Sequence, residues 1–118
     1  MPYSKQEIYL ITKRLHEMLK EHPGWIVLKK LRGMCALYEL EGRKVTITLD
    51  PRKDIIPSLI HESLHHWYPD WPESKVEKHE RLIMNSLTSS QTKHILILLA
   101  DVLNKKIYYR KTMKNKKS

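Results

Sequence analysis

The spacing of hydrophobic residues changes twice along this chain, and this change restricts the folds that it can adopt. Near the start, apolar residues recur at the three- and four-residue intervals of an amphipathic helix: Ile8, Ile11, Leu15, Met18 and Leu19. Residues 25–49 instead hold three short apolar runs separated by turn signals, which is typical of strands. Helical spacing then returns and continues to Leu103. The order αβββααα predicts an α+β fold.

The first half of the chain carries clear boundary signals. Ser4 and Glu7 form a capping box for the first helix, and Pro23-Gly24 ends it. Glu41-Gly42 marks a turn between two of the apolar runs. We therefore predict a small three-stranded antiparallel sheet, with strands at residues 25–28, 34–40 and 45–49.

Three helices are predicted after the sheet. Pro57 suits the first turn of a helix that runs through Trp67, and two prolines in Tyr68-Pro69-Asp70-Trp71-Pro72 make a tight connection. The next helix starts near Glu73 and is broken at residues 88–90. The last helix runs through residues 95–103.

The positive charge of the chain is concentrated at its C-terminus. The formal net charge is +9, yet seven of the 22 Lys and Arg lie in residues 105–118, which contain no acid. The remaining 15 cations face 13 Asp and Glu, an excess of only +2. We predict a domain at residues 1–104 and a basic tail at 105–118, with no specific binding of nucleic acid expected. Binding of nucleic acid through this tail, with Tyr108 and Tyr109, remains an alternative.

A single cysteine, Cys35, excludes a disulfide scaffold and a zinc site built from thiolates. We expect Cys35 in the core, so any metal must be bound by other side chains. The N-terminus lacks the apolar run of a signal peptide, and the apolar stretch at residues 95–100 is far too short to span a membrane. We expect a soluble cytoplasmic protein with no membrane partner.

His61-Glu62-Ser63-Leu64-His65 matches the pattern H-E-x-x-H. Residues four apart lie one turn above each other on a helix, so both imidazoles can reach one Zn²⁺ while Glu62 lies beside the water that the metal would hold. In a chain of this composition the pattern arises by chance about 0.03 times. The motif therefore predicts a zinc site with His61 and His65 as ligands.

A catalytic zinc site needs a third protein ligand. Glu73, Glu77 and Glu80 share one face of the predicted third helix. If the turn folds that helix back on the second, Glu73 lies opposite His65, whereas Glu80 lies roughly 5–10 Å further along. We predict Glu73 as the ligand, with Glu77 second and Glu80 reachable only if the helices splay.

With the motif at His61–His65 and a glutamate on the next helix, the chain resembles zincin metallopeptidases of the gluzincin type. The strand at residues 45–49 leading into the motif, and the connection at residues 68–72, resemble the minigluzincins in particular. The resemblance implies a minimal zincin fold, zinc on His61 and His65, Glu62 as general base and acid, and a carboxylate from the glutamate helix as third ligand. It also implies latency, with a terminal segment, here residues 105–118, lying over the cleft.

The predicted function is therefore hydrolysis of peptide bonds in a peptide or an unfolded protein. Zinc would activate a water and polarise the scissile carbonyl, and Glu62 would pass the proton of the water to the leaving amine. The strand at residues 45–49 is expected to be a sheet edge to which an extended peptide can add. A second possibility is a catalytically silent protein in which zinc only stabilises a small core.

Overall fold

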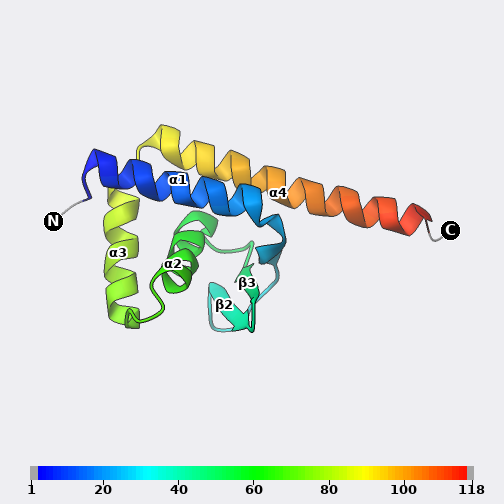
Figure 1. The fold of residues 1–118 in the computed structure, drawn as a ribbon, viewed down its shortest axis with the longest axis horizontal. Coiled ribbons are helices and arrows are strands. Elements are labelled where there is room, and N and C mark those ends of the chain that lie inside the picture. The colour runs from blue at the N-terminus through cyan, green and yellow to red at the C-terminus, as the bar shows by residue number, and fades with distance from the viewer. Residues whose placement is uncertain (1–2, 117–118) are drawn as a thin grey trace.

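Two long helices lie side by side over the rest of the molecule. The structure is a computed structural model that describes the backbone of residues 3–116 and the side chains of residues 3–104. Helices α1 (Lys5–Glu21) and α4 (Ser89–Lys116) pack against each other, and α2 (Ile55–Trp67), α3 (Glu73–Ser86) and the sheet lie beneath them (Figure 1). The predicted α+β class and the four helices are confirmed.

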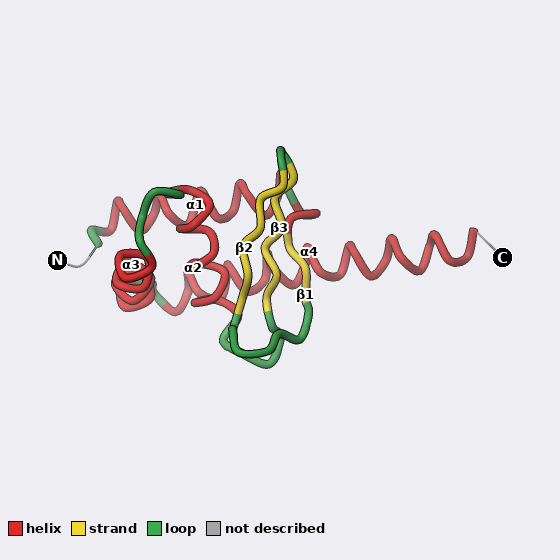
Figure 2. Tube along the Cα trace, turned by 90° about the horizontal axis from the view of Figure 1, so that it is seen from below, coloured by secondary structure: helices red, strands yellow, loops and turns green. Residues whose placement is uncertain are grey.

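The sheet has three strands, β1 (Ile26–Leu28), β2 (Ala36–Glu41) and β3 (Lys44–Leu49), and a short 3-10 helix at Pro23–Trp25 precedes it. Their order is β1-β3-β2, with β3 in the centre (Figure 2). Strands β2 and β3 form the predicted hairpin, whose turn contains Gly42 at φ +61°. β1 pairs with β3 in parallel, from Ile26 opposite Ile47 to Leu28 opposite Leu49. The prediction of a purely antiparallel sheet is therefore wrong, because the sheet is mixed.

The parallel pairing follows from the path of residues 29–35. This loop crosses the end of β3 before the chain enters β2, so β1 and β3 run in the same direction (Figure 2). The carboxylate of Asp50, 1% exposed, accepts a hydrogen bond from the Leu31 backbone N–H at 3.0 Å. The backbone N–H of Asp50 donates to the Cys35 carbonyl at 3.0 Å. Asp50 thus fastens the loop to the end of β3, an interaction that hydrophobic spacing alone does not reveal.

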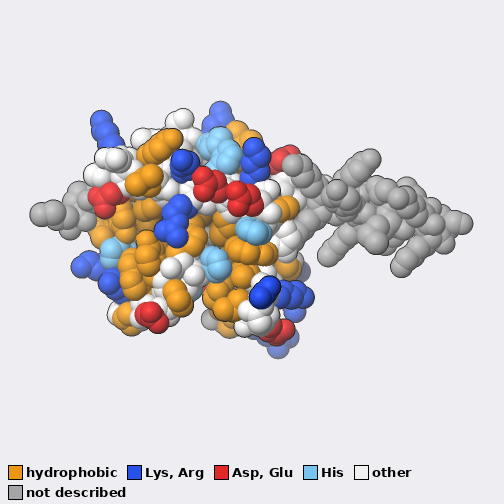
Figure 3. Space-filling model, viewed as in Figure 1, with side chains coloured by type: hydrophobic (Ala, Val, Ile, Leu, Met, Phe, Trp, Pro, Cys, Tyr) orange, Lys and Arg blue, Asp and Glu red, His pale blue; other side chains and the backbone are white. Residues whose placement is uncertain are grey.

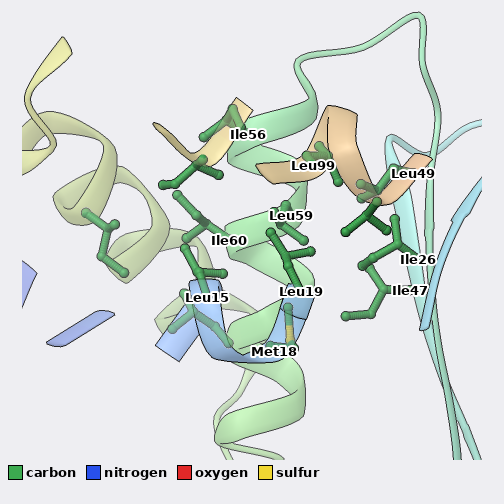
Figure 4. Close-up of a cluster of buried hydrophobic side chains, with 14 of the residues drawn as sticks. Leu15, Met18, Leu19, Ile26, Ile47, Leu49, Ile56, Leu59, Ile60 and Leu99 are labelled. Carbon is green, nitrogen blue, oxygen red and sulfur yellow. The ribbon is translucent and has the colours of Figure 1, made fainter. Parts of the chain in front are cut away.

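One hydrophobic core joins the two layers. Buried side chains of α1 meet those of α2, the strands and α4 (Figure 4). Those labelled are Leu15, Met18, Leu19, Ile26, Ile47, Leu49, Ile56, Leu59, Ile60 and Leu99. Because α2 contributes one face to this core, its opposite face is left for other contacts.

Reciprocal side-chain hydrogen bonds define two helix starts. The Ser4 hydroxyl accepts from the Glu7 backbone N–H at 3.1 Å, and the Glu7 carboxylate accepts from the Ser4 backbone N–H at 3.0 Å, which confirms the predicted capping box. Thr88 and Gln91 make the same pair of contacts at 3.1 and 2.9 Å before α4. Residues 88–90 therefore both break the chain after α3 and begin α4.

The basic C-terminal segment continues α4 as far as Lys116, and this part of the helix extends away from α2 and α3 (Figure 1). Its side chains lie outside the part of the chain that the structure describes, so the predicted boundary at residue 104 and the role of the tail stay predictions. On the face shown in Figure 3, described basic, acidic, histidine and hydrophobic side chains are interspersed. Among the described residues, no helix is both long and apolar enough to cross a membrane.

Candidate metal centre

Helix α2 presents the two histidines of the H-E-x-x-H motif on the side away from the core. Ile60 and Leu64 are buried against the rest of the core, whereas the side chains of His61 and His65 are 17% and 24% exposed. One helical turn separates the two histidines, so both rings leave the helix in the same direction. The helix therefore holds two imidazoles on a rigid support at the edge of a cleft.

The connection between α2 and α3 sets the position of Glu73. The Tyr68 and Trp71 rings stack with centroids 4.2 Å apart, and the Trp71 backbone N–H donates to the Tyr68 carbonyl at 3.1 Å. Pro72 lies directly before the first residue of α3, Glu73. This compact turn returns the chain antiparallel to α2 and brings the Glu73 side chain over the histidines.

The side chains of His61, His65 and Glu73 converge on one point. The His61 Nε2 lies 2.6 Å from one Glu73 carboxylate oxygen, and the His65 Nε2 lies 2.8 Å from the other. The two Nε2 atoms are 3.2 Å apart. One ligand atom from each residue lies within 4.8 Å of the others, so these three residues form a group that could hold a metal ion.

Glu80 contacts the same centre from another side. Its carboxylate lies 2.9 Å from the Nδ1 of His61, the ring nitrogen that faces away from His65. In the part of the chain that the structure describes, Glu80 is not a member of the possible metal-binding group. A carboxylate behind a ligand histidine fixes the ring orientation and the tautomer of that ligand. Sequence reasoning considered Glu80 only as a direct ligand and missed this contact with the Nδ1 of His61.

Glu80 was expected to reach the motif only if the helices splay, yet its carboxylate contacts the Nδ1 of His61, while it stays outside the possible metal-binding group of the described residues. Glu73 and Glu80 are two turns apart on α3, and the His61 ring reaches both carboxylates through its two nitrogens. The rise per residue along a helix gives the distance between backbone positions only. The imidazole ring of His61 spans part of the distance to Glu80. Glu77 lines the cleft but is exposed, and among the described contacts it makes no ion pair with either histidine.

The remaining histidines lie in other contacts. His66 Nδ1 lies 3.0 Å from the Tyr38 hydroxyl, so His66 belongs to the contact between α2 and the sheet. His16 and His94 lie 3.3 Å apart on the surface between α1 and α4. The His79 ring contacts the Tyr3 hydroxyl. The His22 ring stacks on that of Trp25 with centroids 4.0 Å apart. Sequence reasoning assigned these five histidines no role at the metal centre, and among the described residues none of them belongs to the possible metal-binding group.

Glu62 is the one charged side chain of the motif that is buried, at 8% exposure. Burial raises the pKa of its carboxyl above the ordinary value, and the nearby Glu73 and Glu80 raise it further. Positive charge on His61 and His65 acts in the opposite direction. The Glu62 carboxyl also lines the cleft, so it is accessible to a small molecule bound there.

The cleft beside this centre has a volume of about 940 Å³. Its lining includes the three metal-binding candidates, Glu62, and residues 33–38 at and before β2. Cys35 is among these lining residues and is exposed, so the expectation that it is a core residue is wrong. It directly precedes β2, where the chain is still in the loop that crosses the sheet.

The strand nearest this cleft is β2. The expectation that residues 45–49 form a sheet edge is wrong, because β3 pairs with β2 on one side and with β1 on the other. β2 is bonded only to β3 among the described strands, so its other edge faces the cleft through Ala36, Leu37 and Tyr38. A hairpin can place either of its strands at the edge, and the position of β1 decided which one.

No protein-family model, curated protein or solved structure matches this chain. The geometry of the site therefore carries the functional conclusion.

Proposed function

We propose that this protein is a zinc-dependent metallopeptidase that hydrolyses peptide bonds in an extended peptide or an unfolded protein segment. The observation that carries the proposal is the convergence of the His61 Nε2, the His65 Nε2 and the Glu73 carboxylate on one point of an open cleft. Two imidazoles and one carboxylate are the protein ligands of a familiar class of catalytic zinc sites, in which the fourth position stays open.

The spacing of the donor atoms supports zinc as the ion. Two nitrogens that bind a tetrahedral zinc at about 2.05 Å are about 3.3 Å apart. The two Nε2 atoms here are separated by 3.2 Å. The Glu73 side chain is 58% exposed, so it can withdraw by the fraction of an ångström that an ion between the three groups requires. The donor set therefore fits zinc without a movement of α2.

Glu62 is suited to carry the proton in this reaction. Bound zinc supplies a lowered pKa for a water molecule and polarisation of the scissile carbonyl. With zinc bound, the Glu62 carboxylate would accept a proton from the attacking water and return it to the nitrogen of the leaving amine. Its burial favours the protonated form during the transfer, and its place within the motif keeps it one residue from His61.

The free edge of β2 supports a peptide as the substrate. An extended chain can add to a sheet edge through backbone hydrogen bonds, which depend little on its sequence. Residues 36–38 of β2 line the same cleft as His61 and Glu62. A peptide bound along this edge would therefore pass beside the metal centre.

Replacement of Glu62 by Gln tests this proposal. We expect Glu62→Gln to bind one equivalent of zinc per chain but to cleave an unfolded protein about 100-fold to 10,000-fold more slowly, because only the proton carrier is lost. Metal content after purification without chelators and cleavage of an unfolded protein are the measurements. Glu77→Gln is the matched control, since Glu77 lines the same cleft without contacting the histidines, and it should keep both properties.

Two results would contradict the proposal. A protein that takes up no zinc lacks the predicted centre. The second is a protein that zinc stabilises against unfolding but that cleaves no peptide, with or without zinc. Such a protein would be the catalytically silent, zinc-stabilised alternative.

A further inference from the structure

Two loops at one end of the sheet gather positive charge. Residues 29–35 and 50–54 together carry five cations, and in the described part of the chain only Arg52 pairs with a carboxylate, that of Asp50 at 2.8 Å. The other four are exposed and make no ion pair with a described residue. We call these four residues the basic rim: Lys29, Lys30, Arg32 and Lys53.

The basic rim is held in place rather than carried on free loops. Lys29 donates its backbone N–H to the Leu49 carbonyl at 3.1 Å, and Lys53 donates its backbone N–H to the Asp50 carbonyl at the same distance. The Arg52 guanidinium also donates to the Leu31 carbonyl at 3.2 Å. These contacts fasten the backbone of both loops to the end of β3, so the rim residues extend from a defined part of the surface.

Part of this rim borders the cleft of the candidate metal centre. Lys53 itself lines the cleft, as do Gly33 and Met34, which directly follow Arg32. Helix α2 begins at the same place, and its N-cap Asp54 makes no capping hydrogen bond through its side chain. The N-terminus of a helix attracts negative charge. One end of the cleft thus combines side-chain cations with a helix N-terminus. The exposed carboxylate of Asp54 is the negative group at this end.

The opposite wall of the cleft is acidic. Helix α3 contributes Glu73, Glu77 and Glu80 to the lining. A ligand in this cleft therefore meets negative charge along α3 and positive charge at the rim. A nucleic-acid strand, which carries a phosphate at every nucleotide, would be repelled along α3. A peptide can place its charges unevenly, and it can also pair with the free edge of β2.

We propose that the cleft selects peptides that place Asp or Glu side chains against the basic rim. This inference rests on the proposed function, because it assumes that the ligand is a peptide. It adds that the preferred peptides are acidic. Because the rim is exposed, each charge pair is weak and sensitive to salt. Several such pairs together make an acidic peptide preferred over a neutral one of the same length.

Binding to the full-length Glu62→Gln variant tests the inference without hydrolysis. Three fluorescent octapeptides share one apolar centre and carry two Glu at the N-terminal end, two Glu at the C-terminal end, or two Gln at each end. We expect one of the two acidic peptides to bind about three- to tenfold more tightly than the Gln peptide at 20 mM salt. Fluorescence anisotropy reports the affinity, and the preference should shrink at 500 mM salt.

Removing positive charges from the basic rim tests whether these residues cause the preference for acidic peptides. Added to Glu62→Gln, the pair Arg32→Gln and Lys53→Gln should abolish the preference while leaving affinity for the Gln peptide unchanged. The matched pair Arg43→Gln and Lys44→Gln removes the same charge at the other end of the sheet and should leave the preference intact. Circular dichroism confirms that each variant is folded. The inference is overturned if all three peptides bind equally well. It is also overturned if both double substitutions reduce the preference for acidic peptides to the same extent.

Two further outcomes separate the proposals. A single-stranded deoxythymidine octamer that binds more tightly than the acidic peptide at 150 mM salt overturns the choice of a peptide ligand. If the wild type cleaves neutral and acidic peptides with equal kcat/KM, the peptidase proposal stands and the specificity fails. If the wild type cleaves neither kind of peptide but still binds acidic peptides more tightly through the basic rim, the binding preference stands and the peptidase proposal fails.

Discussion

His61 contacts carboxylates through both of its ring nitrogens. Its Nδ1 lies 2.9 Å from Glu80 and its Nε2 lies 2.6 Å from Glu73. A neutral imidazole has one N–H, so it can donate to only one of these carboxylates. If Nδ1–H donates to Glu80, the lone pair of Nε2 faces the Glu73 oxygen, and a proton or a cation between them is needed. This single ring therefore links the orienting carboxylate to the proposed metal position.

The role of Glu80 yields a prediction about metal affinity. Glu80→Ala should weaken zinc binding about 10-fold to 100-fold, because His61 loses the partner that fixes its ring and tautomer. Competition with a chelator of known affinity measures the zinc dissociation constant. Glu77→Ala removes a carboxylate from the same helix without touching either histidine and should change the constant little. Equal losses in both variants would mean that only the overall negative charge of α3 matters.

The juxtaposition of His61 and His65 could be predicted from the sequence because helical periodicity alone places residues 61 and 65 on one face. Glu73 could be ranked first because a short turn fixes which residues of two helices lie opposite each other. The contact of Glu80 with the Nδ1 of His61 depends on the rotation of α3 about its own axis. That rotation is set by packing of α3 against the core through Val76 and Ile83, which spacing along the chain does not describe.

Among the elements, the loop at residues 29–35 depends on one buried carboxylate. Hydrogen bonds from the Arg52 side chain and from the Leu31 and Arg52 backbone N–H groups lower the pKa of the Asp50 carboxyl well below its usual range. The ionised form is therefore favoured in the folded protein more than in the unfolded chain. Its contribution to stability is present above the unfolded pKa of about 3.9 and is lost as the pH falls toward the lowered value.

Asp50→Asn should accordingly destabilise the protein at neutral pH. The difference in unfolding free energy between wild type and variant should be constant above about pH 5 and should shrink as the pH falls below about 4, where Asp50 of the unfolded wild-type chain takes up a proton while the folded protein keeps this carboxylate ionised. Urea unfolding at a series of pH values measures it. Asp70→Asn is the control, because Asp70 is exposed in the turn before α3. A difference that does not change between pH 7 and pH 3 would show that the charge of Asp50 is unimportant.

Element order and the boundaries of the first three helices could be predicted closely, whereas strand direction could not. The last helix was predicted at residues 95–103 and in fact spans Ser89–Lys116. The capping residues and Pro23-Gly24 act locally, so the start and end of α1 follow from neighbours in the sequence. The direction of β1 relative to β3 depends on where the loop at residues 29–35 passes. The buried Asp50 decides that path by bonding to Leu31, a contact between two segments 19 residues apart.

At the scale of the whole molecule, the candidate metal centre joins α2, which carries His61 and His65, to α3, which begins at Glu73. A ligand that binds only the folded state stabilises it, by about 2.7 kcal/mol at 100 times its dissociation constant. We therefore expect excess zinc to raise the unfolding free energy in urea and a chelator to reverse this. His61→Ala should remove the effect.

A matched variant distinguishes the centre from other histidines. His16→Ala removes a histidine from the exposed pair between α1 and α4 and should keep the full effect of zinc. Stabilisation by zinc that survives in His61→Ala but disappears in His16→Ala would place the metal between α1 and α4 instead.

The sequence by itself determined the features that depend on residues close together in the chain. These include the helix caps, the β2–β3 hairpin, the face shared by His61 and His65, and the return of Glu73 after a short turn. Only the tertiary structure decided the parallel pairing of β1, the choice of β2 as the free edge, and the contact of Glu80 with His61. Each of these depends on how separate elements pack around the core, and packing is determined by all of their side chains at once.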